Sequence, residues 1–167
     1  LGHANLTHGT LAMHRLVDEI GADAVLAVRH AVEAPANARQ HSLALWVLWR
    51  LEALATDDLR HAMAQDSRDV RVQAMKILAE WGKWSDADRA LAITSLADPD
   101  AFVQRAAADA LSQHRHDDHV RALLDWLPGI PESDVHLRHE VRAMNRRTIL
   151  ALESAGADVR SAATGTA

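Results

Sequence analysis

The sequence contains no cysteine and no tyrosine, and only four prolines, seven glycines and one phenylalanine. The lack of cysteine excludes disulfides, thiolate metal sites, iron–sulfur clusters and covalent c-type haem attachment within these 167 residues. Few aromatic strand formers and an abundance of alanine favour helix over strand. No stretch approaches 18 uninterrupted apolar residues, so we expect no membrane insertion.

The chain also has no excess of positive charge. The 18 basic and 23 acidic side chains give a formal net charge of −5 when the 11 histidines are counted as neutral. Because proteins that neutralise phosphates are normally basic, this balance disfavours general nucleic-acid binding. An apolar fraction of 49% with a charged fraction of 25% is typical of one folded domain or one stretch of a repeat array.

A repeated helical pattern organises the chain. One unit, Leu96 to Leu111, reads L-A-D-P-D-A-F-V-Q-R-A-A-A-D-A-L, and another, Ala64 to Leu78, reads A-Q-D-S-R-D-V-R-V-Q-A-M-K-I-L. Five units align on one helical position, here called the anchor, at steps of 30 to 34 residues: Gly9, Arg39, Arg71, Gln104 and Arg138. Such near-constant spacing predicts helix pairs that bury their apolar faces only by stacking on one another.

Each unit repeats one apolar stripe. The residue three positions after the anchor is mostly small, and the residue seven positions after it is mostly large, so both lie on one helical face. A small residue lets a neighbouring helix approach closely, and a large one fills the space between helices. We therefore expect these side chains to be buried: Ala12, Leu16, Trp46, Ala74, Leu78, Ala107 and Leu111.

Helix boundary signals agree with this arrangement. Ser85 followed by Asp88 is typical of a capping box, and Gly21 stands where a helix should stop. We predict an all-α protein of about four to five helix pairs, with one repeat domain over residues 1–152. Residues 153–167 are small and polar, which predicts a flexible C-terminal tail.

The two central units resemble a known family. The pattern D-x-x-x-V-R-x-x-A-x-x-x-L begins at Asp66, and L-x-D-P-D-x-x-V-x-x-x-A-x-x-x-L begins at Leu96; both look like HEAT repeats, closest to the phycobilisome-lyase-type HEAT-like variety. The resemblance covers about residues 1–152 and implies an α-α superhelix, or solenoid. It also implies a ladder of turn aspartates and helix arginines, whose places are taken here by Asp66 with Arg71 and by Asp98 with Gln104.

A second resemblance concerns the segments LGHANLTHGTLAMHRL, ARQHSLALWVLWRL and HLRHEVRAMNRR. They look like the HEAT region of planctomycete-type membrane-bound dehydrogenase-like proteins that carry a haem-binding domain. This resemblance implies a helical spacer between a β-propeller module and a cytochrome-c-like module, in an extracytoplasmic protein; without that context we expect a cytoplasmic one. Because the chain opens on Leu1 with no signal segment, we expect a fragment of a longer chain.

A histidine cluster is the main candidate for metal binding. His114, His116 and His119 flank Asp117 and Asp118, and these residue types can ligate zinc or nickel. The alternative is that the imidazoles favour a helix C-terminus while the aspartates begin the next helix. We favour the alternative and expect neither metal nor cofactor.

Two further groups are candidates for binding. Arg138, Arg142 and Arg146 form a basic stripe with the adjacent Arg147, suited to an acidic partner or to phosphates. Trp81 and Trp84 flank a helix end, where indoles serve as anchors for a partner or pack between repeats. The candidate contact residues are therefore Trp81, Trp84, Arg138, Arg142, Arg146 and Arg147.

No phosphate-binding loop, nucleophile elbow or carboxylate pair stands out. We predict a non-catalytic scaffold that binds a protein partner or a sibling domain of the same polypeptide. One alternative is a HEAT-like nucleic-acid-binding protein or DNA glycosylase, which the negative charge disfavours. Another is a metal-dependent hydroxylase-like HEAT protein, which is expected to carry several His-Glu pairs, whereas His139-Glu140 is the only such pair here.

Overall fold

A computed structural model describes residues 1–114, 116–135, 138, 142 and 146. These residues form helices and turns without a strand, which confirms the all-α prediction. The α-helices are α1 (Leu6–Arg15), α2 (Val25–Glu33), α3 (Ala38–Arg50), α4 (Thr56–Met63), α5 (Arg68–Glu80), α6 (Asp86–Ser95), α7 (Ala101–Gln113) and α8 (Asp117–Trp126). Within the described part of the chain, none is long and apolar enough to cross a membrane.

The chain divides into two compact units, Leu1–Leu78 and Ala79–Ala167. The boundary falls near the end of α5, so the N-terminal unit holds α1 to α4 and most of α5, and the C-terminal unit holds α6 to α8. The proposed tail over residues 153–167 lies outside the described residues.

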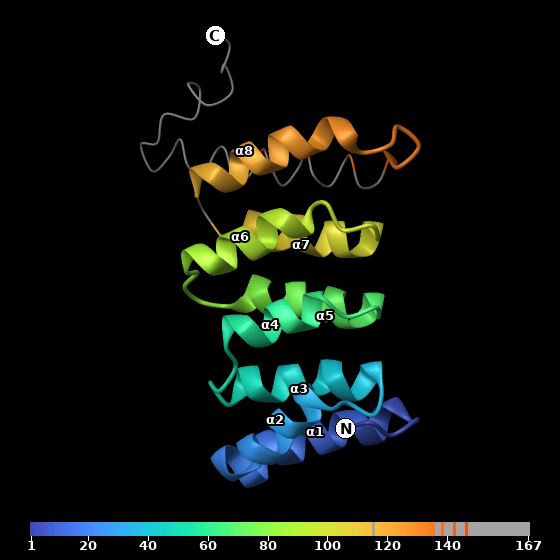
Figure 1. Cartoon of the computed structure of the whole chain (residues 1–167), viewed down its shortest axis with the longest axis vertical. Coiled ribbons are helices and arrows are strands. Elements are labelled where there is room, and N and C mark those ends of the chain that lie inside the picture. Colours follow the sequence, from blue (N-terminus) through green and yellow to red (C-terminus); the bar gives the residue numbers. More distant parts are fainter. Residues whose placement is uncertain (115, 136–137, 139–141, 143–145, 147–167) are drawn as a thin grey trace. The chain divides into compact units, whose positions relative to one another are not determined.

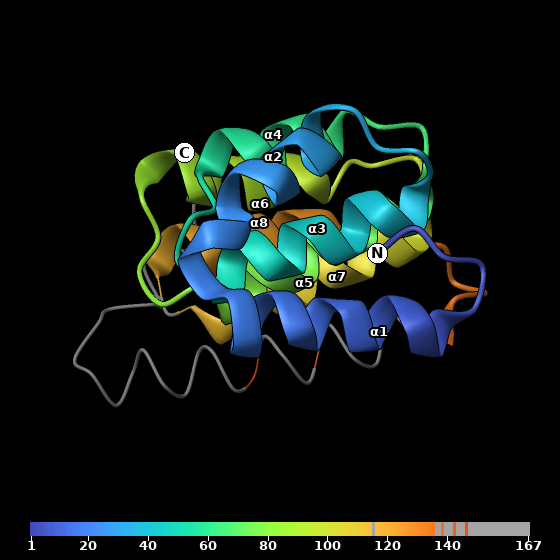
Figure 2. The same ribbon diagram turned by 90° about the horizontal axis from the view of Figure 1, so that it is seen from below.

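Helix α3 forms the centre of the N-terminal unit. It packs against α2 on one side and α1 on the other (Figures 1 and 2). Its fully buried side chains include Leu45 and Leu48, as expected for an apolar stripe at helical spacing. A partly buried ion pair joins α2 to α4, because Nη1 of Arg29 lies 3.2 Å from both carboxylate oxygens of Asp58.

Gly9, the anchor of the first unit, lies where α1 meets α3. A Cβ atom at this position would stand 3.0 Å from the carbonyl oxygen of Leu1 and 3.0 Å from Cδ1 of Leu43. Real Cβ atoms rarely come so close to other atoms, so the absence of a side chain permits this packing.

In the C-terminal unit, α6 packs against α7, and α8 contacts both helices (Figure 1). Val103 and Leu123 are fully buried there. The predicted capping box is present at the start of α6: the backbone N–H of Ser85 donates to Oδ2 of Asp88 at 2.8 Å, and the backbone N–H of Asp88 donates to Oγ of Ser85 at 3.3 Å.

The predicted stripe is confirmed on α5 and α7, and it is wrong on α1 and at Trp46 of α3. Four of its members have no exposed surface: Ala74, Leu78, Ala107 and Leu111. Ala12 and Leu16 are only partly buried: the buried residues of α1 are Gly9 and Met13, and the chain leaves α-helical geometry at Leu16 for a π-helical turn, Leu16–Ile20. That turn ends at Gly21 with φ of 65° and interrupts the helical period. Trp46 is half-buried, since its ring lines a groove.

The anchor position makes the same kind of contact in several units. Each anchor side chain beyond Gly9 donates to a backbone carbonyl of a non-helical segment: Arg39 to His3, Arg71 to Gln65 and Asp66, Gln104 to Asp98, and Arg138 to Ile130. The bonds from Arg71 and Gln104 go to the backbone carbonyls of the two turn aspartates that the family resemblance names, at 2.9 Å to Asp66 and 2.7 Å to Asp98. Carbonyls outside helices have no intrahelical donor, so these bonds satisfy them.

Candidate functional site

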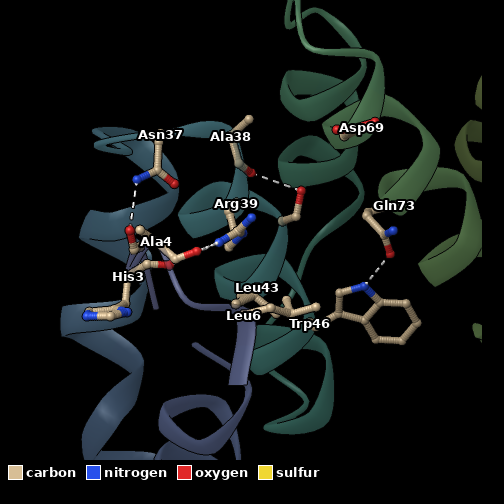
Figure 3. A pocket seen from close by; sticks show the side chains of 12 residues that line it. His3, Ala4, Leu6, Asn37, Ala38, Arg39, Leu43, Trp46, Asp69 and Gln73 are labelled. Atoms are coloured by element: carbon tan, nitrogen blue, oxygen red, sulfur yellow. Dashed lines mark hydrogen bonds between the residues drawn. The ribbon is translucent and has the colours of Figure 1, made fainter. Parts of the chain in front are cut away.

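The N-terminal unit contains an open groove. It has a volume of about 760 Å³ and is lined by three stretches, within residues 2–6, 37–46 and 69–73 (Figure 3). The first stretch includes the start of α1, the second belongs to the N-terminal part of α3, and the third to α5. Ligand-binding pockets in proteins commonly enclose 300–1,000 Å³, so this groove has room for part of a peptide.

Trp46 stands in the groove with its ring fixed from two sides. Its Nε1–H donates to Oε1 of Gln73 at 2.9 Å, and its ring packs edge-on against Trp49 with centroids 5.4 Å apart. The two tryptophans lie three residues apart on α3, and Gln73 comes from the facing helix α5. An indole that is already fixed loses little conformational entropy when a ligand covers it.

Arg39 contributes the positive charge of the groove. It is exposed in the first turn of α3, and its Nη1 donates to the backbone oxygens of His3, at 3.1 Å, and Ala4. Nearby, the side chain of Asn37 caps α3 by accepting from the backbone N–H of Gln40 at 2.9 Å. No carboxylate within the described part of the chain pairs with Arg39, so its charge faces neutral oxygens.

The rest of the groove wall includes two leucines and one acidic residue. Leu6 is 60% exposed and Leu43 is half-buried. The carboxylate of Asp69 has a cationic partner, since Nε of Arg68 lies 3.5 Å from its Oδ1. The groove thus combines an apolar surface, a fixed indole and an uncompensated guanidinium, a combination suited to recognition by contact.

Of the two predicted indoles in the C-terminal unit, Trp84 packs against histidines. Its ring stacks on that of His114 with centroids 4.0 Å apart and an interplanar angle of 27°, and lies 5.2 Å from the ring of His119. Trp81 follows the end of α5 and is half-buried. Trp84 thus supports the packing of this unit, while Trp81 stays a candidate contact residue.

Each of the three clustered histidines takes part in a hydrogen bond with the backbone. Nε2 of His114 lies 3.0 Å from the carbonyl oxygen of Ala79, and Nδ1 of His119 lies 2.8 Å from that of His114. His116 caps α8, where its Nδ1 accepts from the backbone N–H of Asp118 at 3.3 Å. Among the described residues, no group of three His, Asp or Glu side chains is arranged to hold a metal ion.

Two histidines are buried with one ring nitrogen lacking a partner. Among the described residues, neither Nε2 of His41 on α3 nor Nε2 of His119 on α8 has a hydrogen-bond partner, and each of the two residues is 1% exposed. Burial lowers the pKa of His41, and the neighbouring His61, with its ring centroid 6.3 Å away, lowers it further. Burial is also the main cause that lowers the pKa of His119.

The structure describes three members of the predicted basic stripe. Arg138 is half-buried and donates to the carbonyl of Ile130 at 3.0 Å, so it has a structural contact. Arg142 and Arg146 are helical and exposed. Outside the described residues lie Arg147, His136, His139 and Glu140.

Sequence reasoning did not single out the groove, although its residues occupy fixed repeat positions. Arg39, Leu43 and Trp46 stand at the anchor and four and seven positions after it, and Gln73 stands two positions after the next anchor. The sequence did contain one signal for the groove: an anchor arginine is followed by a tryptophan on the same helical face.

Comparison with known proteins does not assign this chain to a family. No family model, no curated protein sequence and no solved structure matches this chain. The function therefore has to be argued from the geometry of the groove and from the residues around it.

Proposed function

We propose that this chain is a non-catalytic interaction scaffold that binds a segment of a partner protein, or of a sibling domain, in the groove of its N-terminal unit. The observation that carries the proposal is Trp46, a half-buried indole fixed by Gln73 on the floor of an open groove of about 760 Å³. Tryptophan is enriched among residues that dominate binding energy at interfaces, above all where its surroundings exclude water.

The surroundings of the indole favour a macromolecular partner. The groove is open to solvent, whereas sites for small molecules usually enclose most of their ligand. Residues 2–4 form part of its wall, and the hydrogen bond from Asn37 Nδ2 to the carbonyl of Gly2, at 3.0 Å, helps to hold them in place. A pre-formed wall lowers the entropic cost of binding an extended segment.

The finer architecture is part of the same proposal. A HEAT-like solenoid would repeat the anchor contact in each helix pair, and the bonds of Arg71 and Gln104 to their turns support that arrangement. Stacked repeats present one side of every unit along an extended surface, so contacts from several units add. Trp81, Arg142 and Arg146 are then secondary contact candidates.

Site-specific crosslinking tests the proposal. A photoreactive amino acid at Leu43, inside the groove, should capture a partner from native lysate, whereas the same group at the exposed Lys76, outside the groove, should not. The captured protein is then purified and its affinity measured against the wild type and against Trp46→Ala. We expect Trp46→Ala to weaken binding by at least about tenfold, the usual cost of truncating an interface anchor. Equal affinity for the two proteins would overturn the proposal.

A further inference from the structure

We infer that the groove selects an extended peptide segment in which one carboxylate side chain stands close to an aliphatic or aromatic side chain. This inference rests on the proposed function, since it names the partner chemistry of the same groove. Three properties of the described residues lead to it: an arginine of the groove without a counter-charge, an amide group with unused donors, and an apolar wall.

The groove holds a guanidinium without a bound counter-charge, although the chain as a whole is negative. Arg39 donates through Nη1 to two neutral carbonyl oxygens, and no carboxylate of the described residues compensates it. The one acidic residue of the groove, Asp69, has Arg68 at 3.5 Å. A guanidinium that is held in place but lacks a counter-charge favours a carboxylate from outside, and the two can pair in bidentate geometry.

One polar side chain of the groove keeps unused hydrogen-bond donors. The amide oxygen of Gln73 accepts the hydrogen bond from Trp46, and the NH₂ group of Gln73 donates to no described residue. The amide oxygen of Asn37 is occupied by the N–H of Gln40, and the hydroxyl of Ser42 donates to the carbonyl of Ala38 at 3.0 Å. The unused amide hydrogens of Gln73 favour a ligand that carries hydrogen-bond acceptors. An extended peptide supplies such acceptors through its backbone carbonyls and a carboxylate.

The apolar part of the groove lies beside the arginine. Figure 3 shows Leu6, Leu43 and Trp46 gathered on one side, close to Arg39. Leu6 is 60% exposed, so covering it removes apolar surface from water. The ligand therefore places its apolar side chain within a few residues of its carboxylate.

The net charge of −5 restricts the partner further. A run of acidic residues would be repelled by the rest of the chain, whereas a single carboxylate gains from Arg39 at short range and is little affected at physiological salt. We therefore expect one acidic residue in the recognised segment and not an acidic tract.

Selection from a random dodecapeptide library displayed on phage tests this inference with the full chain as bait. The enriched peptides should share one Asp or Glu within about four residues of a Leu, Ile, Phe or Trp. For a synthetic peptide from that pool, changing its acid to the amide should weaken binding to the wild type by about tenfold or more, as loss of a charged hydrogen bond does. This comparison needs no change in the protein.

Charge reversal in the protein gives the second measurement. Arg39→Glu should change the selected sequences from acidic to Lys or Arg at the same position, whereas Arg39→Lys should keep the acidic preference. Arg50→Glu is the matched control, because Arg50 is also an exposed arginine on α3 but does not line the groove. Far-UV circular dichroism establishes that each variant is folded.

The outcomes separate this inference from the proposed function. Peptides that compete with one another and lose affinity for Trp46→Ala, but show no acidic residue, overturn the inference and leave the proposed function standing. Failure to enrich any peptide that depends on Trp46 argues against both. An acidic consensus that Arg39→Glu leaves unchanged overturns the role of Arg39.

Discussion

The indole N–H of Trp46 donates to the side-chain oxygen of Gln73 across 2.9 Å, and this bond joins α3 to α5. It crosses 27 residues of sequence and fixes the ring orientation that the groove presents. Because the amide oxygen of Gln73 accepts this bond, its NH₂ group points away from the indole. One contact therefore orients both the apolar ring of Trp46 and the hydrogen-bond donors of Gln73.

Gln73→Ala should therefore affect stability and binding together. Loss of a partly buried hydrogen bond costs about 0.5–1.5 kcal/mol of unfolding free energy, and the freed indole has to be ordered again when a ligand binds. Urea unfolding measures the first effect and titration of a groove-binding peptide the second. Gln113→Ala is the control, since Gln113 is exposed and its side chain bonds only within α7. Identical peptide affinity for Gln73→Ala and the wild type would count against a role of this bond in binding.

Leu78 and Leu16 test the register of the repeat. Leu78 has no exposed surface, so Leu78→Ala should lower the unfolding free energy by about 2–5 kcal/mol. Leu16 is only partly buried at the start of the π-helical turn, so Leu16→Ala should cost clearly less. Chemical denaturation of both variants gives the comparison. Equal losses would mean that Leu16 packs as the repeat pattern predicts.

These residues also show how far the sequence predicts the fold. The regular spacing on α5 and α7 was sufficient to place Ala74, Leu78, Ala107 and Leu111 in the core, because a helix that keeps its period keeps its buried face. After α1 the period is broken by the π-helical turn before Gly21, a local change of backbone geometry that hydrophobic spacing does not predict.

The candidate site was less predictable than the fold. The groove exists because residues 2–6, 37–46 and 69–73 meet in space, and the pattern of one helix does not show what faces it. For the same reason, the stacking of Trp84 on His114 was not foreseen: the two residues are 30 positions apart and belong to different segments. Short-range signals such as the Ser85–Asp88 capping box were predicted correctly because both partners lie within one turn.

Gly9 permits the close approach of α1 and α3, and Gly9→Val should lower stability by about 1–3 kcal/mol. The added Cβ would stand 3.0 Å from the Leu1 carbonyl and from Leu43, and the gain in helix propensity over glycine is smaller than this overpacking cost. Thermal unfolding followed by circular dichroism measures the effect. Gly82→Val provides a control, because a Cβ at Gly82 meets no atom within 4 Å. A Gly9→Val protein as stable as the wild type would show that α1 can move away without loss.

Mild acid should destabilise the protein through its two buried histidines. Burial lowers the pKa of His41 and of His119 below the ordinary histidine value of 6.5. The unfolded chain therefore binds more protons than the folded chain in the range below that value. Their contribution to stability is complete above about pH 6.5 and is lost as the pH falls toward the lower pKa values of the folded state. Urea unfolding at pH 7.5 and pH 5.5 should give a smaller unfolding free energy at the lower pH.

His41→Phe isolates one source of this dependence. The variant removes the titrating group and keeps a ring in the core, so the difference in unfolding free energy between pH 7.5 and pH 5.5 should shrink, whatever the variant does to stability at neutral pH. His30→Phe is the matched control, because His30 is exposed on α2 and should leave the difference unchanged. His61→Gln should reduce the dependence only in part, since His61 is the second cause of the lowered pKa of His41 after burial. If His41→Phe keeps the full pH dependence of the wild type, protonation of His41 is not what weakens the fold in acid.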